Sequence, residues 1–275
     1  MLEVLAEMFS YPFLVRAVVV GLLVSLCAAL LGVSLVLKRY SMIGHGLSHV
    51  GFGTLAVATA LKVAPLMVSI PVMVAAAFLL LRVSENSRLK GDSAIALIST
   101  SSLAVGVVVI SLTTGMNTDV CNYMFGSILA MSRSDVNLSI TLAIVVLALF
   151  VLFYNKIFAV TFDESFARAT GVRAGLYNML IAVLTAITIV LGMRMMGALL
   201  ISSLIIFPAL TSMRVCKKFG VVTICSAIVS VICFFLGIVG SYLYAFPTGA
   251  SVVIVNLAAF LLFWLANNVI RRMRT

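Results

Sequence analysis

The chain has 275 residues, of which 64% are hydrophobic and only 9% are charged. Soluble domains contain about 45–50% apolar and about 25% charged residues, so the surplus apolar surface has to face lipid and a soluble fold is excluded. The net charge of +10 comes without a basic cluster interleaved with aromatic residues, which excludes a nucleic-acid surface and indicates basic loops beside a membrane.

The first residues predict a short helix that lies at the membrane surface. Leu2, Leu5 and Phe9 share one helical face. Glu3 and Glu7 occupy positions where a cleavable signal peptide would carry Lys or Arg, so we expect no such peptide.

Nine apolar runs follow, and at roughly 20 residues for each crossing the chain is long enough for about eight or nine crossings. They occupy residues 14–37, 47–62, 65–81, 93–113, 136–154, 176–192, 197–213, 220–244 and 249–270. A shorter segment at 119–131 is more typical of an interfacial or re-entrant helix. We expect an all-α integral membrane protein: a polytopic bundle of about eight or nine transmembrane helices plus short interfacial and coupling helices, in a single domain over residues 1–275.

The basic residues predict the orientation of the bundle. About 14 of the 18 Lys and Arg residues fall in loops on one side, and Arg16, Lys62, Arg133 and Arg194 fall on the other. Because basic loops stay in the cytoplasm, the first side is cytoplasmic. Nine crossings then place the C-terminus inside and the N-terminus outside.

The two histidines of the chain are candidate metal ligands. His45 and His49 are four residues apart, so a helix would bring both rings onto one face. Two imidazoles in that arrangement can bind one Zn²⁺ or a similar ion. The alternative is that both cap helices or bond backbone carbonyls, but ionisable groups within a span favour a functional role.

The sequence argues against an enzyme. A metalloprotease would need His-Glu-x-x-His, and no acid lies between these histidines. Ser48 adjoins His49, but a neighbour in sequence is not thereby an activated nucleophile. The chain also lacks the Gly-x-x-x-x-Gly-Lys-Ser/Thr phosphate loop, so any ATPase has to be another chain.

A polar loop between the fifth and sixth runs predicts a short amphipathic helix. Asp163 and Glu164 suit its start, where the helix dipole favours negative charge, and Gly171 suits its end. Ala167 and Arg168 are helix formers between them, and Phe166 is left exposed unless something covers it. The helix either rests on the membrane or docks a soluble partner.

The run at 197–213 contains Pro208, which removes one backbone hydrogen bond and bends a helix. Such a bend either shapes a transport path or is a feature of packing.

Four segments are together similar to the membrane subunits of metal-uptake ABC transporters, the zinc/manganese/iron permeases. They are the Lys-Arg to Gly-His-Gly-Leu-Ser-His run of residues 38–49, the Met-Phe-Gly-Ser-Ile-Leu run of residues 124–129, the loop of residues 163–171 and the Gly to Pro-Ala helix of residues 197–209. Each segment alone is a weak signal. Their order and the matching hydropathy over nearly the whole chain make the resemblance specific.

The resemblance implies a homodimer of permeases over two cytoplasmic ATP-binding subunits, fed by an extracytoplasmic metal-binding protein. It implies a pathway role for His49 and the neighbouring Ser48, and docking on the ATPase for residues 163–171. Asp119 falls where the family has an extracytoplasmic gate, and Pro208 lies in the bent helix. The transported divalent metal ion is cargo, and we expect no permanently bound cofactor.

This chain departs from the family at one position, since His45 stands where the family usually has an acid. Imidazole in place of carboxylate favours Zn²⁺ over harder ions such as manganese or iron. Two rival functions remain at this stage. One is a related importer of cobalamin, haem or siderophore, and the other is an ion-coupled secondary carrier or a membrane scaffold.

Overall fold

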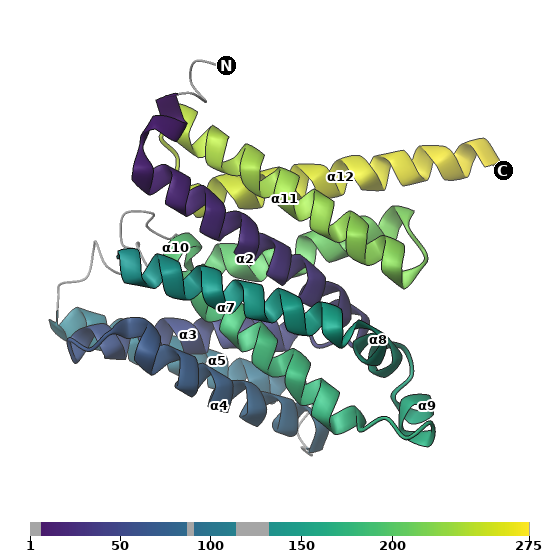
Figure 1. The fold of residues 1–275 in the computed structure, drawn as a ribbon, viewed down its shortest axis with the longest axis horizontal. Coiled ribbons are helices and arrows are strands. Elements are labelled where there is room, and N and C mark those ends of the chain that lie inside the picture. Colours follow the sequence, from purple (N-terminus) through teal and green to yellow (C-terminus); the bar gives the residue numbers. More distant parts are fainter. Residues whose placement is uncertain (1–6, 87–90, 114–131, 275) are drawn as a thin grey trace.

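A computed structural model describes residues 7–86, 91–113 and 132–274 (Figure 1). All regular structure in these residues is helical, which confirms the all-α prediction. The helices are α2 (Pro12–Leu37), α3 (Ser41–Ala60), α4 (Pro65–Asn86), α5 (Gly91–Thr113), α7 (Arg133–Leu152), α8 (Tyr154–Phe162), α9 (Glu164–Ala169), α10 (Ala174–Val215), α11 (Phe219–Tyr244) and α12 (Thr248–Arg274).

Helix α10 contains two membrane-length segments, Ala174–Arg194 and Met196–Val215. At the start of the second segment Gly197 adopts φ 83° and ψ 164°, a conformation that is essentially reserved for glycine. The chain reverses there, and the two arms diverge from the turn toward the end of the bundle that carries α8 and α9 (Figure 1). The two separate runs predicted at 176–192 and 197–213 are therefore the two arms of one tight helical hairpin.

Eight described segments are long and apolar enough to cross a membrane, counting the two arms of α10 separately. The 20-residue helix α3, which carries both histidines, is not among them. It packs against α4, α5 and α10, and most of its side chains are buried in protein. A more polar helix is tolerated at this position because neighbouring helices cover it in place of lipid.

The core lies where α2 meets the α10 hairpin. A Cβ atom added at Gly32 of α2 would lie 2.0 Å from the backbone oxygen of Ile205, so the two helices approach each other closely. Small residues of this kind are what allows membrane helices to pack tightly. Helices α11 and α12 cover the opposite side of α2 and α10 from α3, α4 and α5 (Figure 1).

The short helices α8 and α9 lie at one end of the bundle (Figure 1). The turn between α2 and α3 and the C-terminal end of α12 lie toward the same end. The described segments that carry Lys38, Lys156 and Arg168 thus lie toward one end. The predicted N-terminal surface helix and the segment at 119–131, which includes Asp119, lie wholly or mostly outside the described residues.

Candidate metal pathway and coupling helix

The two histidine rings meet on one face of α3, as their spacing predicts. The Nε2 atoms of His45 and His49 are 3.2 Å apart, so one ring donates its Nε2–H to the other. The ring centroids are 4.6 Å apart and the planes are perpendicular. Both side chains are half-buried.

This separation fits chelation of a single ion. Two nitrogens bound at about 2.0–2.1 Å to one tetrahedral ion lie about 3.3 Å apart. The Nδ1 atom of His49 is buried and has no hydrogen-bond partner among the described residues. A buried ring nitrogen without a partner is costly, and an ion bound between the Nε2 atoms would not relieve that cost.

The pair supplies only part of a coordination shell. No group of three or more His, Cys, Asp or Glu side chains in the described part of the chain could hold a metal ion. A structural zinc site has four protein ligands, whereas a site that has to release its ion can use fewer. The geometry therefore fits a transient site better than a permanent one.

Ser48 lies between the histidines in sequence, but its hydroxyl is directed to another helix. It is fully buried, donates to the backbone oxygen of His45 at 2.7 Å and accepts from Ser202 of α10 at 3.0 Å. Its contacts connect α3 to the second arm of the α10 hairpin and fix the helix that carries the histidines. Sequence reasoning did not identify Ser202, although a polar residue in an apolar run is the signal that could have found it.

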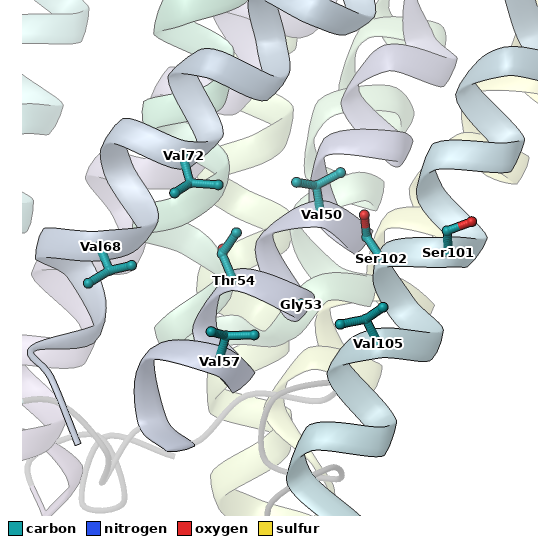
Figure 2. Close-up of a pocket in the computed structure, with 9 residues that line it drawn as sticks. All are labelled: Val50, Gly53, Thr54, Val57, Val68, Val72, Ser101, Ser102 and Val105. Carbon is teal, nitrogen blue, oxygen red and sulfur yellow. The ribbon is translucent and has the colours of Figure 1, made fainter. Parts of the chain in front are cut away.

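A cavity of about 420 Å³ lies between α3, α4 and α5 (Figure 2). Its lining is Val50, Gly53, Thr54, Val57, Val68, Val72, Ser101, Ser102 and Val105. The histidines do not line it, and neither carboxylates nor thiols do. Its valines and hydroxyls are poor ligands for a transition-metal ion, so the cavity is not the metal site.

Pro208 lies in the second arm of α10, where it is buried. The next residue, Ala209, packs in a small core cluster with Val33 and Phe219. These are packing contacts between α10, α2 and α11, and they do not involve the histidine pair.

The loop after α8 forms the short helix that the sequence predicts. The Asp163 side chain accepts a hydrogen bond from the backbone N–H of Phe166 at 2.9 Å and so caps α9. Gly171 has φ 83° just after the helix end. Phe166 is 65% exposed, whereas Ala167 is fully buried. The helix is therefore anchored on one side and presents Phe166 and Arg168 on the other.

Glu164, at the first position of α9, is hydrogen-bonded to residues of two other helices. It accepts from Lys38 Nζ at 3.2 Å and from Asn178 Nδ2 at 3.0 Å, and it also pairs with Arg168. Burial by itself raises the pKa of Glu164, but the hydrogen bonds from Asn178, Arg168 and Lys38 outweigh that effect and lower its pKa. Sequence reasoning assigned Glu164 to the helix start and did not identify Lys38 or Asn178 as its partners.

A second ion pair lies at the other end of the bundle. Arg194, at the end of the first arm of α10, is 3.3 Å from Asp135 in the first turn of α7. Asp135 also completes a capping box with Ser132, and sequence reasoning did not single it out.

Comparisons with known proteins find similarity over nearly the whole length of the chain. The model of the ABC 3 transport family matches residues 10–267. The chain is 28% identical to a manganese transport system membrane protein, MntC, of Halalkalibacterium halodurans, over 93% of this chain and 88% of that one. It is 29% identical to the high-affinity zinc uptake system membrane protein ZnuB of Haemophilus influenzae, over 92% of this chain and 97% of that one. It is 32% identical to a probable metal transport system membrane protein of Thermotoga maritima, over 93% of this chain and 90% of that one.

Solved structures share the fold. PsaBC from Streptococcus pneumoniae, solved with a Fab, superposes with a TM-score of 0.86 at 26% identity and covers 95% of this chain and 94% of that one. An inward-facing ABC transporter described as of metal-chelate type has a TM-score of 0.75 at 15% identity, which shows a common fold alone. The chain therefore belongs to the ABC 3 transport family, and it is a multi-pass permease subunit of the metal-uptake type whose ATPase is a separate chain.

Proposed function

We propose that this chain is the single-domain permease of an ATP-driven importer of divalent transition-metal ions, and that zinc is its preferred cargo. The observation that carries the proposal is the histidine pair, whose Nε2 atoms are 3.2 Å apart on a helix buried in the bundle. The rings provide transient ligands that an ion meets on its way through the membrane. The ion is released again because two ligands do not complete its shell.

The preference for zinc rests on the chemistry of the ligands. Both His45 and His49 offer neutral nitrogen, and zinc accepts nitrogen ligands more readily than manganese does. The relatives are divided between the two metals, since MntC is a manganese protein and ZnuB is a zinc protein. The argument for zinc therefore comes from the residues of this chain.

A homodimer would provide two such pairs along the path. His45 and His49 of each protomer would offer the ion two nitrogen ligands, so each pair binds it only transiently. The half-burial of both rings in one protomer leaves part of each ring available to the ion.

The ends of the bundle suit two different partners. We assign the end that carries α8, α9 and the C-terminus to the cytoplasm, because most basic loops lie there. Cytoplasmic ATP-binding subunits dock on α9, whose exposed Phe166 then becomes covered. An extracytoplasmic metal-binding protein delivers the ion at the opposite end.

The rival cargo, a cobalamin, haem or siderophore, would need a wide cavity with apolar or aromatic walls. The cavity between α3, α4 and α5 is of drug-like size and has mostly valine walls, so the cavity by itself does not separate the two cargoes. Family membership and the histidine pair favour the free ion.

Reconstitution in liposomes tests the proposal. The permease with its ATP-binding subunits and its metal-binding protein should accumulate zinc only when ATP is present, and accumulate less manganese and no metal chelate. Metal uptake by the permease alone, driven by a proton or sodium gradient, would instead identify a secondary carrier.

A further inference from the structure

Lys38 follows the last residue of α2, and its ammonium group is buried there. The Lys38 side chain is only 6% exposed. Its Nζ atom donates to the backbone oxygen of Val160 in α8 at 2.9 Å and to Glu164 of α9 at 3.2 Å. Burying a charge in this way is costly unless it is paired, so the position of Lys38 depends on Glu164.

The same carboxylate reaches the start of α10. Asn178 is 2% exposed, and its Nδ2 atom donates to the Glu164 oxygen that also accepts from Lys38. We call this set, Glu164 with Lys38, Asn178 and the Val160 carbonyl, the Glu164 junction. It connects the ends of α2 and α8 and the start of α10 to a helix of only six residues.

The junction lies next to the start of α3. Lys38 and Asn178 line a crevice of about 10 Å³ together with Tyr40 and Ile43, which leaves room for no more than about one water molecule. Ile43 is two residues before His45 in the same helix. Because the side chains around this crevice are closely packed, the start of α3 has to move when Lys38 shifts.

The connection from α2 to α3 is short and tightly bonded. Arg39 has φ 60°, and the backbone N–H of Tyr40 donates to the Leu35 oxygen at 2.7 Å. The Lys38 ammonium also lies 5.6 Å from the centre of the Tyr40 ring. No flexible linker lies between the junction and the helix that carries the histidines.

We propose that the Glu164 junction transmits movement of α9 to the histidine pair, with Glu164 as the positioning residue. This inference rests on the proposed docking of ATP-binding subunits on α9. When those subunits close, α9 moves, and Glu164 pulls Lys38 and Asn178 with it. The start of α3 follows, which changes the access of ions and water to His45 and His49.

Chemical labelling of the histidines tests this without any metal. The chain contains only His45 and His49, so modification by diethyl pyrocarbonate, located by mass spectrometry, reports on the pair directly. In the purified complex with its ATP-binding subunits, ATP should change the labelling rate of the wild type. In Glu164→Gln the ATP effect should fall by about tenfold, within the range of couplings between sites, while the complex stays assembled. An unchanged ATP effect in Glu164→Gln would overturn the proposal.

A double variant separates transmission from stability. Lys38→Met with Glu164→Gln removes both charges and leaves no buried unpaired ammonium at the junction. We expect this variant to fold and bind its partners but to lack the ATP effect. If it regains the wild-type effect, the junction only stabilises the fold and the inference is wrong.

The matched control is Lys156→Met, which removes an exposed lysine of α8 that is not part of the junction. It should label as the wild type does. A wild-type complex whose labelling does not respond to ATP would overturn the proposed ATP-driven function, and the junction with it. A wrong assignment of the metal would leave the ATP effect and its dependence on Glu164 in place.

Discussion

At the scale of single residues, the histidine pair makes the metal preference testable. The resemblance to the metal-uptake permeases implies an acid at the position of His45, so we expect an acid there to reverse the preference. We expect His45→Asp to raise the ratio of manganese to zinc uptake by about tenfold, which corresponds to about 1.4 kcal/mol of differential binding. Competitive uptake of the two labelled ions in cells measures the ratio. An unchanged ratio would show that His45 does not contact the ion.

The lowered pKa of Glu164 predicts how the stability of the fold depends on pH. Its pKa is lowered in the folded protein from an ordinary value of 4.5. Its contribution to stability is therefore fully present above that value and is lost as the pH falls through the lowered pKa. The difference in unfolding midpoint between wild type and Glu164→Gln should be largest at neutral pH and shrink below pH 4.5. A difference that stays constant to pH 3 would contradict the assignment.

At the scale of elements, the α10 hairpin depends on Gly197. An alanine at φ 83° and ψ 164° is strained, so Gly197→Ala should cost about 1–3 kcal/mol and lower the melting temperature by several degrees. Gly175 is the matched control, because it lies in the first turn of the same helix and nothing within 4 Å would meet its Cβ. Gly175→Ala should leave stability unchanged or raise it slightly. Thermal unfolding in detergent compares the two variants.

Hydropathy predicted most of the helices but misplaced the start of α3. The apolar run begins at residue 47, whereas the helix begins at Ser41. His45 and the glycines at 44 and 46 dilute the hydropathy of the first two turns, and protein contacts there replace lipid contacts. Helix α8 was also missed, because it is short and is held by packing of Phe158 and Phe162 on Phe219, which only the tertiary structure brings together.

The candidate site was predicted in part for a similar reason. The i, i+4 spacing is local, so the sequence alone brought His45 and His49 together. The cap at Asp163 and the glycine at 171 are local signals too, and α9 formed where they predicted it. The contacts Ser48–Ser202 and Lys38–Glu164 join residues more than a hundred positions apart, and no local pattern encodes them.

At the scale of the whole molecule, the charge distribution predicts the orientation of the bundle. An epitope tag after Thr275 should bind antibody only after the membrane is permeabilised. A tag in the turn between α3 and α4, where Leu61 is 66% exposed, should bind antibody on intact cells or spheroplasts. The opposite pattern would reverse the orientation and remove α9 from the cytoplasm.

The central claim is that the histidine pair of α3 contacts the transported ion. The most direct test is uptake of radioactive zinc and manganese by cells that carry the wild-type chain with its native partners, compared with His45→Ala and His49→Ala. We predict that both variants lose uptake of zinc, the preferred ion, while expression and assembly with the ATP-binding subunits remain normal. Normal uptake by both variants would contradict the account and leave the chain a metal-uptake permease whose ion path lies elsewhere.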